Sequence, residues 1–219
     1  MKKLIVFGMI LFGCLLLAHS QKVVTKNIPV QGQKTEMNFR FADTIQIEAW
    51  NKNAIELHVT ATIDHNRYNE FFTLDVKEQG GQIELIENVD FEGIKKTEGT
   101  KHLNNFNTEI NYRLKVPANL EFDLNTISGK IILVGSQGKM AINSVSGFID
   151  YSVPQAHQAH IGLSTVTGNV YTNLKFEEKS SSGEISWVGT KRDLSLNGGS
   201  TAVELKTVSG DIYLRKYQN

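Results

Sequence analysis

A short motif recurs through the second half of this chain: a hydroxyl residue, an aliphatic residue, a second hydroxyl residue, glycine, any residue and an aliphatic residue. Four copies fit this pattern, and a fifth, weaker copy carries serine at its first aliphatic position. In chain order the copies are Thr126–Ile131, Ser144–Ile149, Thr165–Val170, the weaker Ser180–Ile185, and Thr207–Ile212. Fixed chemistry at recurring intervals is typical of a stacked β architecture, in which each copy contributes one unit to a shared core.

Aligning the copies separates an inner face from an outer face. The residue two positions after the glycine is always aliphatic, and the residue four positions after it is mostly apolar. Because side chains two apart on a strand lie on one face, these positions predict the buried side. The glycine permits a positive φ at a corner, so the motif glycines are candidate structural turn residues. They are Gly129, Gly147, Gly168, Gly183 and Gly210.

The first half of the chain alternates with period two. Ile55, Leu57 and Val59 alternate with polar residues, which predicts strands with one buried face and leaves room for only a short helix near residues 64–70. In a solenoid, identical positions stack into continuous columns, which would explain why every turn carries the same residues. The sequence therefore favours an all-β parallel β-helix, with rungs of uneven length and an N-terminal β-strand portion. Hairpins also use Ser-Gly turns, so a β-sandwich is the alternative.

The N-terminus has the form of a secretory signal peptide. Lys2 and Lys3 give a positive start, residues 4–17 are largely apolar, and Ala18-His19-Ser20 places small residues before a cleavage site at Gln21. The apolar run is shorter than the roughly 20 residues that cross a membrane. We therefore expect removal of the leader and no membrane span in the mature protein. The expected organisation is a signal peptide at 1–20 and a single domain at 21–219.

Cys14 is the only cysteine of the chain and lies inside the leader. Residues 11–14 resemble a bacterial lipobox, but the apolar run continues past the cysteine, so a lipid anchor at Cys14 is the less favoured alternative. Without this cysteine the exported protein has no disulfide bonds. This favours a bacterial envelope, either the periplasm or the cell surface.

The charges of the chain are balanced, with 23 Lys and Arg against 23 Asp and Glu. Loss of Lys2 and Lys3 with the leader leaves a net charge of about −2. Since basic clusters with interleaved aromatic residues are also missing, we expect no nucleic-acid partner.

Few residues are candidates for catalysis or metal binding. Ser200 follows two glycines but lacks the later glycine of a nucleophile elbow. His157 and His160 are three apart, so on a strand they would point to opposite faces. Asp150 and Asp211 stand at different offsets from their glycines and would not stack into a carboxylate cluster. We therefore expect no enzymatic activity, metal or cofactor.

Three aromatic residues are better candidates for a binding surface. Phe148, Tyr171 and Tyr213 occupy outward offsets in separate motif copies, where they would either stack on sugar rings and proteins or be partly buried under the N-terminal strands. The polar segment 88–107 is about 20 residues long, which predicts either a surface insertion or a binding loop.

Together these features resemble a known family. An exported chain, an alternating first half, the strand Tyr112-Arg113-Leu114-Lys115-Val116-Pro117 and repeated Thr-Val-Ser-Gly-x-Ile units resemble the bacterial putative-adhesin domain of unknown function, over roughly Asn38 to Arg215. They resemble less closely the auto-transporter adhesin head domains of Bacteroidetes-type bacteria. The resemblance implies an irregular right-handed β-helix at the cell envelope and no catalytic residues.

The expected function is a non-enzymatic, adhesin-like binding or scaffolding module. Its expected partner is an envelope protein or a surface glycan. Two alternatives are a periplasmic component that docks a partner in an envelope-stress or regulatory system, and a polysaccharide-active β-helix enzyme.

Overall fold

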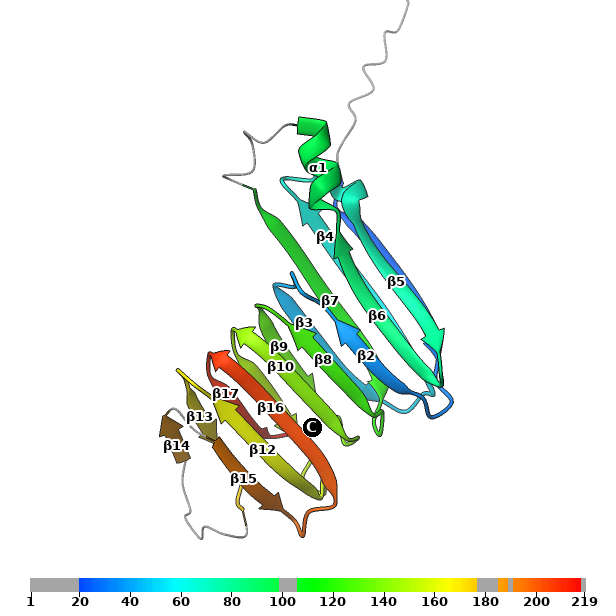
Figure 1. Ribbon diagram of the computed structural model, residues 1–219. Coiled ribbons are helices and arrows are strands. Elements are labelled where there is room, and N and C mark those ends of the chain that lie inside the picture. The colour runs from blue at the N-terminus through cyan, green and yellow to red at the C-terminus, as the bar shows by residue number, and fades with distance from the viewer. Residues whose placement is uncertain (1–19, 99–105, 177–184, 189–190, 218–219) are drawn as a thin grey trace, which may run out of the picture.

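The computed structural model describes residues 20–98, 106–176, 185–188 and 191–217 of the chain. They form two stacked β-sheets (Figure 1). One short helix lies at the end of the molecule where the N-terminal strands are located. Among these residues no helix is long and apolar enough to cross a membrane.

The first layer, sheet A, has nine strands, and their spatial order differs from their order along the chain. From one edge to the other they are β1 (Lys22–Pro29), β4 (Ala54–Ile63), β7 (Thr108–Pro117), β3 (Thr44–Trp50), β9 (Lys130–Val134), β11 (Ile149–Val153), β17 (Ile212–Lys216), β13 (Asn169–Thr172) and β14 (Ile185–Val188).

The second layer, sheet B, has eight strands. In spatial order they are β15 (Lys191–Leu196), β12 (Ala159–Thr165), β16 (Thr201–Ser209), β10 (Met140–Ser146), β8 (Phe122–Thr126), β2 (Lys34–Asn38), β6 (Gln82–Val89) and β5 (Phe72–Gln79). The middle strands of both sheets are parallel, and antiparallel strands flank them at the ends of each sheet.

The two sheets bury the aliphatic positions of the motif between them. In sheet A, Ile131, Ile149, Ile212 and Val170 follow one another in register, and all four are fully buried. In sheet B, a second buried row consists of Leu124, Ile142, Leu205 and Leu163. Burying each such side chain contributes about 1.5–3 kcal/mol. The alternating pattern thus correctly predicts which side chains form the core.

In the first two motif copies, the first hydroxyl serves the turn that leads from sheet B into sheet A. The Thr126 Oγ1 donates to the carbonyl of Ser128 at 2.8 Å, and the Ser144 Oγ donates to the carbonyl of Ser146 at 2.8 Å. These two hydroxyls are buried, and each is satisfied by a backbone carbonyl of its own turn. The Thr165 Oγ1 instead donates to the carbonyl of Gly210 in the neighbouring copy at 3.0 Å, and the buried Thr207 Oγ1 has no partner among the described residues.

The β-helix predicted from the motif is wrong. A solenoid winds its copies in chain order, but here the last copy lies between the second and third, because β16 pairs with β10 and β12, and β17 pairs with β11 and β13. Antiparallel strand pairs also form the edges of both sheets, which a parallel β-helix would not have. The motif sets each crossing from one layer to the other, which a sandwich needs as much as a solenoid does. The architecture is the alternative, an all-β sandwich of two mixed sheets.

The N-terminal half contains two short helical segments. The helix predicted near residues 64–70 is a single 3₁₀ turn, Asn69–Phe71, preceded by left-handed backbone at Asp64, His65 and Asn66. An α-helix, α1 (Phe91–Glu98), lies within the segment 88–107 that the sequence indicated as a loop. The Asp90 Oδ1 accepts a hydrogen bond from the Gly93 amide at 2.8 Å and caps this helix. Residues 99–105 of the segment lie outside the described part of the chain.

Candidate binding face

The outer face of sheet A is the candidate binding face. No described helix or strand packs on it, so the outward side chains of the strands from β1 to β13 face solvent (Figure 1). Because the strands are in register, outward residues form rows that run across the sheet. One such row, from β1 to β13, consists of Thr25, His58, Arg113, Gln46, Ile132, Asp150, Tyr213 and Tyr171.

The three aromatic residues predicted as a binding surface come together on this face. The rings of Tyr171 and Tyr213 are stacked, with centroids 5.1 Å apart and planes 14° apart. Phe148 meets Tyr213 edge to face, with centroids 6.0 Å apart. All three side chains are half-exposed. We call Phe148, Tyr213 and Tyr171 the aromatic row. The N-terminal strands do not cover it, because they pair edge to edge in the same sheet.

Charged side chains fix the geometry of the aromatic row. The Arg215 guanidinium lies 5.2 Å from the Tyr213 ring centroid and 3.0 Å from the Asp150 Oδ2. The Tyr213 hydroxyl donates to the Asp211 Oδ2 at 3.2 Å. Burial, together with Asp211, raises the pKa of the Tyr213 hydroxyl. The row is thus a preorganised surface that combines ring faces, a cation and a hydroxyl.

Asp150 is the least satisfied group beside the row. Its side chain is only 18% exposed, and its Oδ1 is buried with no hydrogen-bond partner among the described residues. Burial raises the pKa of this carboxyl, while the Arg215 guanidinium opposes the rise. Asp150 faces Tyr213 across the strands, and Asp211 pairs instead with Asn169, whose amide donates to it at 2.8 Å. The two carboxylates therefore have separate partners.

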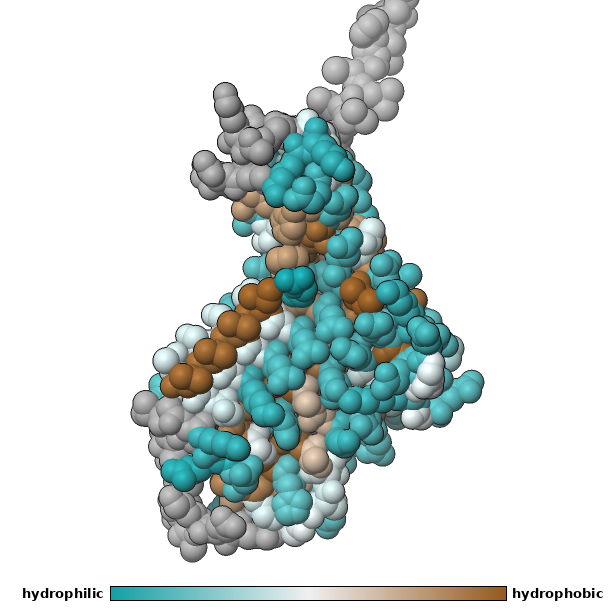
Figure 2. Space-filling model, viewed as in Figure 1, coloured by the Kyte–Doolittle hydropathy of each residue, from teal (hydrophilic) through white to brown (hydrophobic). Residues whose placement is uncertain are grey.

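A second exposed feature lies at the corner between the layers. The aliphatic residue between the two hydroxyls of each motif copy points outward, and the four exposed side chains form the diagonal brown row in Figure 2. In spatial order they are Ile127 (40% exposed), Val145 (51%), Val208 (49%) and Val166 (64%). We call these four residues the aliphatic ridge. Its neighbours are small hydroxyl residues, so the ridge is free of charge.

Four of the five motif glycines lie in one column beneath this ridge. A Cβ built on Gly147 would lie 2.0 Å from the carbonyl oxygen of Gly129, and one on Gly210 would lie 1.8 Å from that of Gly147. Gly168 follows in the same way, 1.9 Å from the Gly210 oxygen. Copies that are neighbours in the sheets are therefore in backbone contact at the position where a side chain would otherwise lie. The fifth glycine, Gly183, lies outside the described residues.

The weaker candidates are separated in the structure. His157 is buried in the turn between β11 and β12, whereas His160 is exposed on β12. The Ser200 hydroxyl donates to the carbonyl of Gln158 at 3.3 Å. The described residues contain no group of three or more His, Cys, Asp or Glu side chains arranged to hold a metal ion.

The buried His157 predicts a pH dependence of stability. Burial lowers the pKa of its ring, and its Nε2 has no partner among the described residues. A lowered folded pKa means that protonation favours unfolding, so stability is lost as the pH falls below about 6.5. We expect His157→Gln to reduce the loss of unfolding free energy between pH 7.5 and pH 5.0, measured with urea. The matched change His160→Gln should leave that loss unchanged, and equal pH profiles for both variants would contradict the prediction.

The sequence matches no protein-family model and no curated protein. Among solved structures, the fold is similar to a "putative cell adhesion protein" from Clostridium sporogenes, with 14% identity, coverage of 90% of this chain and 100% of that chain, and a TM-score of 0.54. At this identity the likeness shows a shared fold.

Two further structures align more loosely. A "putative adhesin" from Parabacteroides merdae has 10% identity, 69% coverage of both chains and a TM-score of 0.26. A "putative adhesin" from Bacteroides fragilis has 9% identity, coverage of 90% of this chain and 98% of that chain, and a TM-score of 0.29. Scores this low add nothing to the assignment of the fold.

Proposed function

We propose that this protein is a non-enzymatic binding module of the bacterial cell envelope that holds a surface glycan on the outer face of sheet A. The observation that carries the proposal is the aromatic row, three contiguous rings on an uncovered sheet. The predicted secretory leader and the adhesion name of the similar Clostridium sporogenes protein support the location and the class.

The chemistry of the row suits a sugar. Aromatic rings offer apolar surface to the C–H groups of a pyranose ring, and the Tyr171 hydroxyl and the Arg215 guanidinium offer donors to its oxygens. Stacking between Tyr171 and Tyr213 and the ion pair of Arg215 with Asp150 hold these groups in place before binding. Such preorganisation reduces the entropy that is lost on binding.

A second candidate function is the docking of an envelope protein. The observation that favours it is the aliphatic ridge, because a charge-free row of exposed Ile and Val side chains is typical of protein contacts rather than of sugar contacts. In that case Ile127, Val145, Val208 and Val166 would form the contact, and the aromatic row would be secondary.

The two functions are separated by substitutions on different surfaces. We expect Tyr171→Ser with Tyr213→Ser to weaken glycan binding by the secreted protein roughly tenfold or more, since each ring contact contributes about 0.5–1.5 kcal/mol. Binding can be measured by glycan array and titration calorimetry. Tyr217→Ser is the matched control, because Tyr217 is 39% exposed and lies outside the row. It should change binding less than twofold.

Two outcomes contradict the proposal. If the double variant remains folded and binds the same glycans with unchanged affinity, the aromatic row is not the site. If Val145→Ser with Val208→Ser abolishes capture of an envelope protein while no glycan binds, the docking function replaces the glycan function.

A further inference from the structure

A groove lies on the same face of sheet A, over the N-terminal strands β4, β7 and β3. It has two adjoining hollows of about 350 and 510 Å³, which share Gln46, His58 and Arg113. Volumes of this order are typical of sites for small molecules or single sugar units. Gln46, His58 and Arg113 come from three neighbouring strands, so they are adjacent only in the folded sheet.

The two hollows differ in charge. The smaller one contains Glu48, Glu56 and Lys115, and the Lys115 Nζ lies 3.9 Å from the Glu56 Oε1. The larger one is lined by no acidic side chain, and its lining contains one guanidinium, that of Arg113, and one imidazole, that of His58. The rest of its polar lining is neutral: Gln21, Thr44, Gln46, Thr60 and Asn111.

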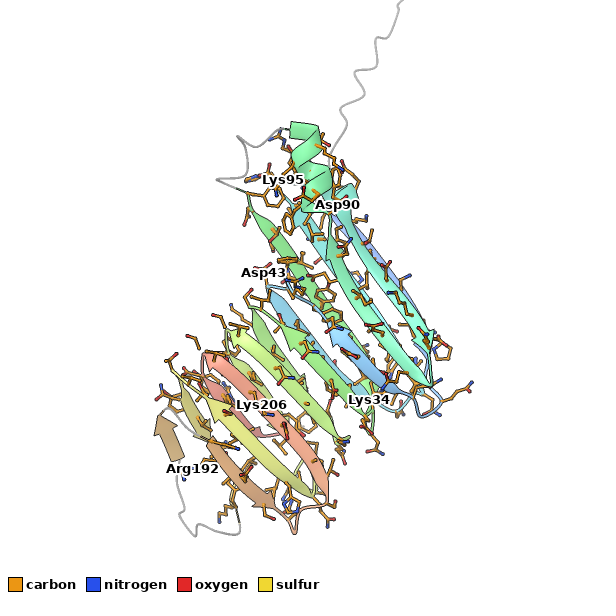
Figure 3. The ribbon with its side chains drawn as sticks, viewed as in Figure 1. Lys34, Asp43, Asp90, Lys95, Arg192 and Lys206 are labelled. Atoms are coloured by element: carbon orange, nitrogen blue, oxygen red, sulfur yellow. The ribbon has the colours of Figure 1, made fainter. Side chains whose placement is uncertain are left out.

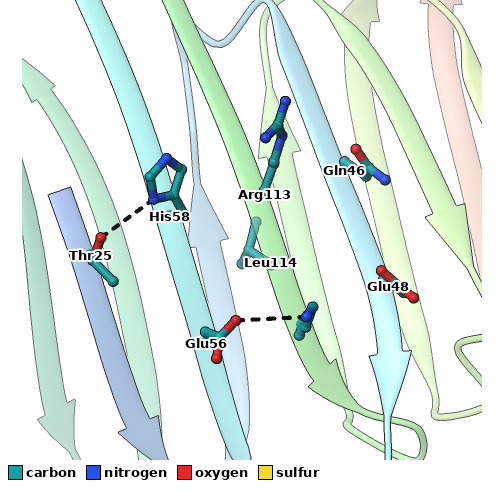
Figure 4. A pocket seen from close by; sticks show the side chains of 8 residues that line it. Thr25, Gln46, Glu48, Glu56, His58, Arg113 and Leu114 are labelled. Atoms are coloured by element: carbon teal, nitrogen blue, oxygen red, sulfur yellow. Dashed lines mark hydrogen bonds and ion pairs between the residues drawn. The ribbon is translucent and has the colours of Figure 1, made fainter. Parts of the chain in front are cut away.

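Arg113 lines both hollows. Figure 4 shows its guanidinium extending away from Glu48 and Glu56, between His58 and Gln46. Within the described part of the chain it makes no ion pair, although two glutamates line the adjoining hollow. Arginine presents a planar fork of donors that fits a carboxylate with two parallel hydrogen bonds. A guanidinium without an ion pair, at the border of a hollow that no acid lines, is therefore complementary to an anion.

His58 adds a second donor beside Arg113. Its Nδ1 lies 3.4 Å from the Thr25 Oγ1, and the dashed line in Figure 4 marks this contact. When the Thr25 hydroxyl donates to Nδ1, the ring proton is on Nε2, which then donates to a ligand. The neutral hydroxyl and amide side chains around these two residues are suited to the hydroxyl groups of a sugar.

We propose that this groove binds the carboxylate of an acidic sugar unit, and that the ligand of the protein is a linear carboxylated polysaccharide lying across the strands of sheet A. This inference rests on the proposed glycan-binding function and names the class of glycan. Arg113 holds the carboxylate, and His58, Gln46 and Asn111 hold ring hydroxyls.

The register of the sheet connects the groove to the aromatic row. Arg113, Asp150, Tyr213 and Tyr171 belong to one row of outward side chains, and the path from β7 to β13 crosses five strand spacings. At about 4.8 Å per spacing, this is roughly 24 Å. A polymer of several units spans that distance, and contacts at both ends of one chain add to the affinity as multivalent contacts do.

The experiment compares polymers that differ in charge. Polygalacturonate and alginate supply carboxylates, dextran and galactan are neutral, and dextran sulfate supplies a different anion. We expect the secreted protein to bind the carboxylated polymers at least tenfold more tightly than the neutral ones, with a preference that falls as salt is raised. Arg113→Gln should remove this preference and leave any weaker binding to neutral polymers through the aromatic row.

Arg192→Gln is the matched control. Arg192 is exposed on β15 of sheet B, away from the groove (Figure 3), and its replacement removes the same charge. It should change binding less than twofold. If both arginine variants lose affinity equally, the preference comes from net charge, and the groove is not the site. If dextran sulfate binds as tightly as the carboxylated polymers, the ligand class is wrong.

The outcomes also separate this inference from the function on which it rests. Equal binding of neutral and carboxylated polymers that is lost in the Tyr171 and Tyr213 variant would overturn the groove and retain the glycan-binding function. Loss of binding in Arg113→Gln with no loss in the tyrosine variant would retain the anion site and overturn the role of the aromatic row. If no carboxylated polymer binds at millimolar sugar, the inference is wrong.

Discussion

Replacing Gly147 with alanine should lower the unfolding free energy by about 3 kcal/mol or more. Gly147 has φ +104°, a region that costs an L-residue about 1–3 kcal/mol. The new Cβ would also lie 2.0 Å from the Gly129 carbonyl oxygen, and backbone held in two sheets cannot yield cheaply. Urea unfolding monitored by circular dichroism measures the loss. Valine, which is larger and β-branched, should destabilise the protein further.

Two other glycines separate the two causes. Gly32 has φ +88° and nothing within 4 Å of the added Cβ, so Gly32→Ala should cost only the backbone strain, about 1–2 kcal/mol. Gly168 has a φ outside the left-handed region, but an added Cβ would lie 1.9 Å from the Gly210 oxygen. Gly168→Ala should therefore lower the unfolding free energy through this steric clash alone. A Gly147 variant no less stable than the Gly32 variant would show that the glycine column does not hold the copies together.

The sequence predicts the inner face of this protein better than its topology. The aliphatic positions after each glycine form the core because a period of two leaves only one buried face. The spatial order of the motif copies cannot be predicted in this way, because their core residues have nearly the same shape and chemistry. These residues are Ile131, Ile149, Ile212 and Val170. Their columns would pack equally well in several orders. Nothing in the motif indicates that the last copy lies between the second and third, and that insertion excludes the solenoid.

Of the candidate site, likewise, one part could be predicted from the sequence and the other could not. Phe148, Tyr171 and Tyr213 can be placed on the outer face from their offsets within the motif, since corresponding offsets share a face. The groove cannot be placed like this, because Gln46, His58 and Arg113 lie in three strands without a shared motif. Their adjacency follows from β7 pairing with both β3 and β4, a long-range arrangement that alternation alone does not determine.

One buried acid, Glu87, could have been recognised from the sequence, because it occupies an inward position in an alternating strand. In β6, Ile83, Leu85 and Val89 point inward, and the same parity places Glu87 in the core, where it is 4% exposed. Its Oε1 accepts the Phe41 amide at 2.6 Å, and its Oε2 accepts the Tyr112 hydroxyl at 2.7 Å. A charged residue at an inward position indicates a specific buried partner, because an unpaired one would be too costly.

Glu87→Leu should therefore destabilise the protein by roughly 3–5 kcal/mol. The change leaves the Phe41 amide and the Tyr112 hydroxyl buried without an acceptor, and each unsatisfied donor costs about 1–3 kcal/mol. Glu84→Leu is the matched control, because Glu84 lies on the outer face of the same strand and its replacement should cost less than about 0.5 kcal/mol. Urea unfolding at pH 7 compares the two variants, and equal stabilities would contradict the buried role of Glu87.

The pH dependence of Glu87→Gln tests the same site without removing its bulk. Burial raises the pKa of the Glu87 carboxyl, while the hydrogen bonds from Tyr112 and Phe41 oppose the rise. A raised folded pKa means that the stabilising contribution is complete below the unfolded value of about 4.3 and is lost as the pH rises through the folded value. Glutamine does not ionise, so the stability of Glu87→Gln relative to the wild type should increase as the pH rises from 4 to 8. A constant difference across that range would mean that Glu87 titrates alike in the folded and unfolded chains, and the inference of a raised pKa would be wrong.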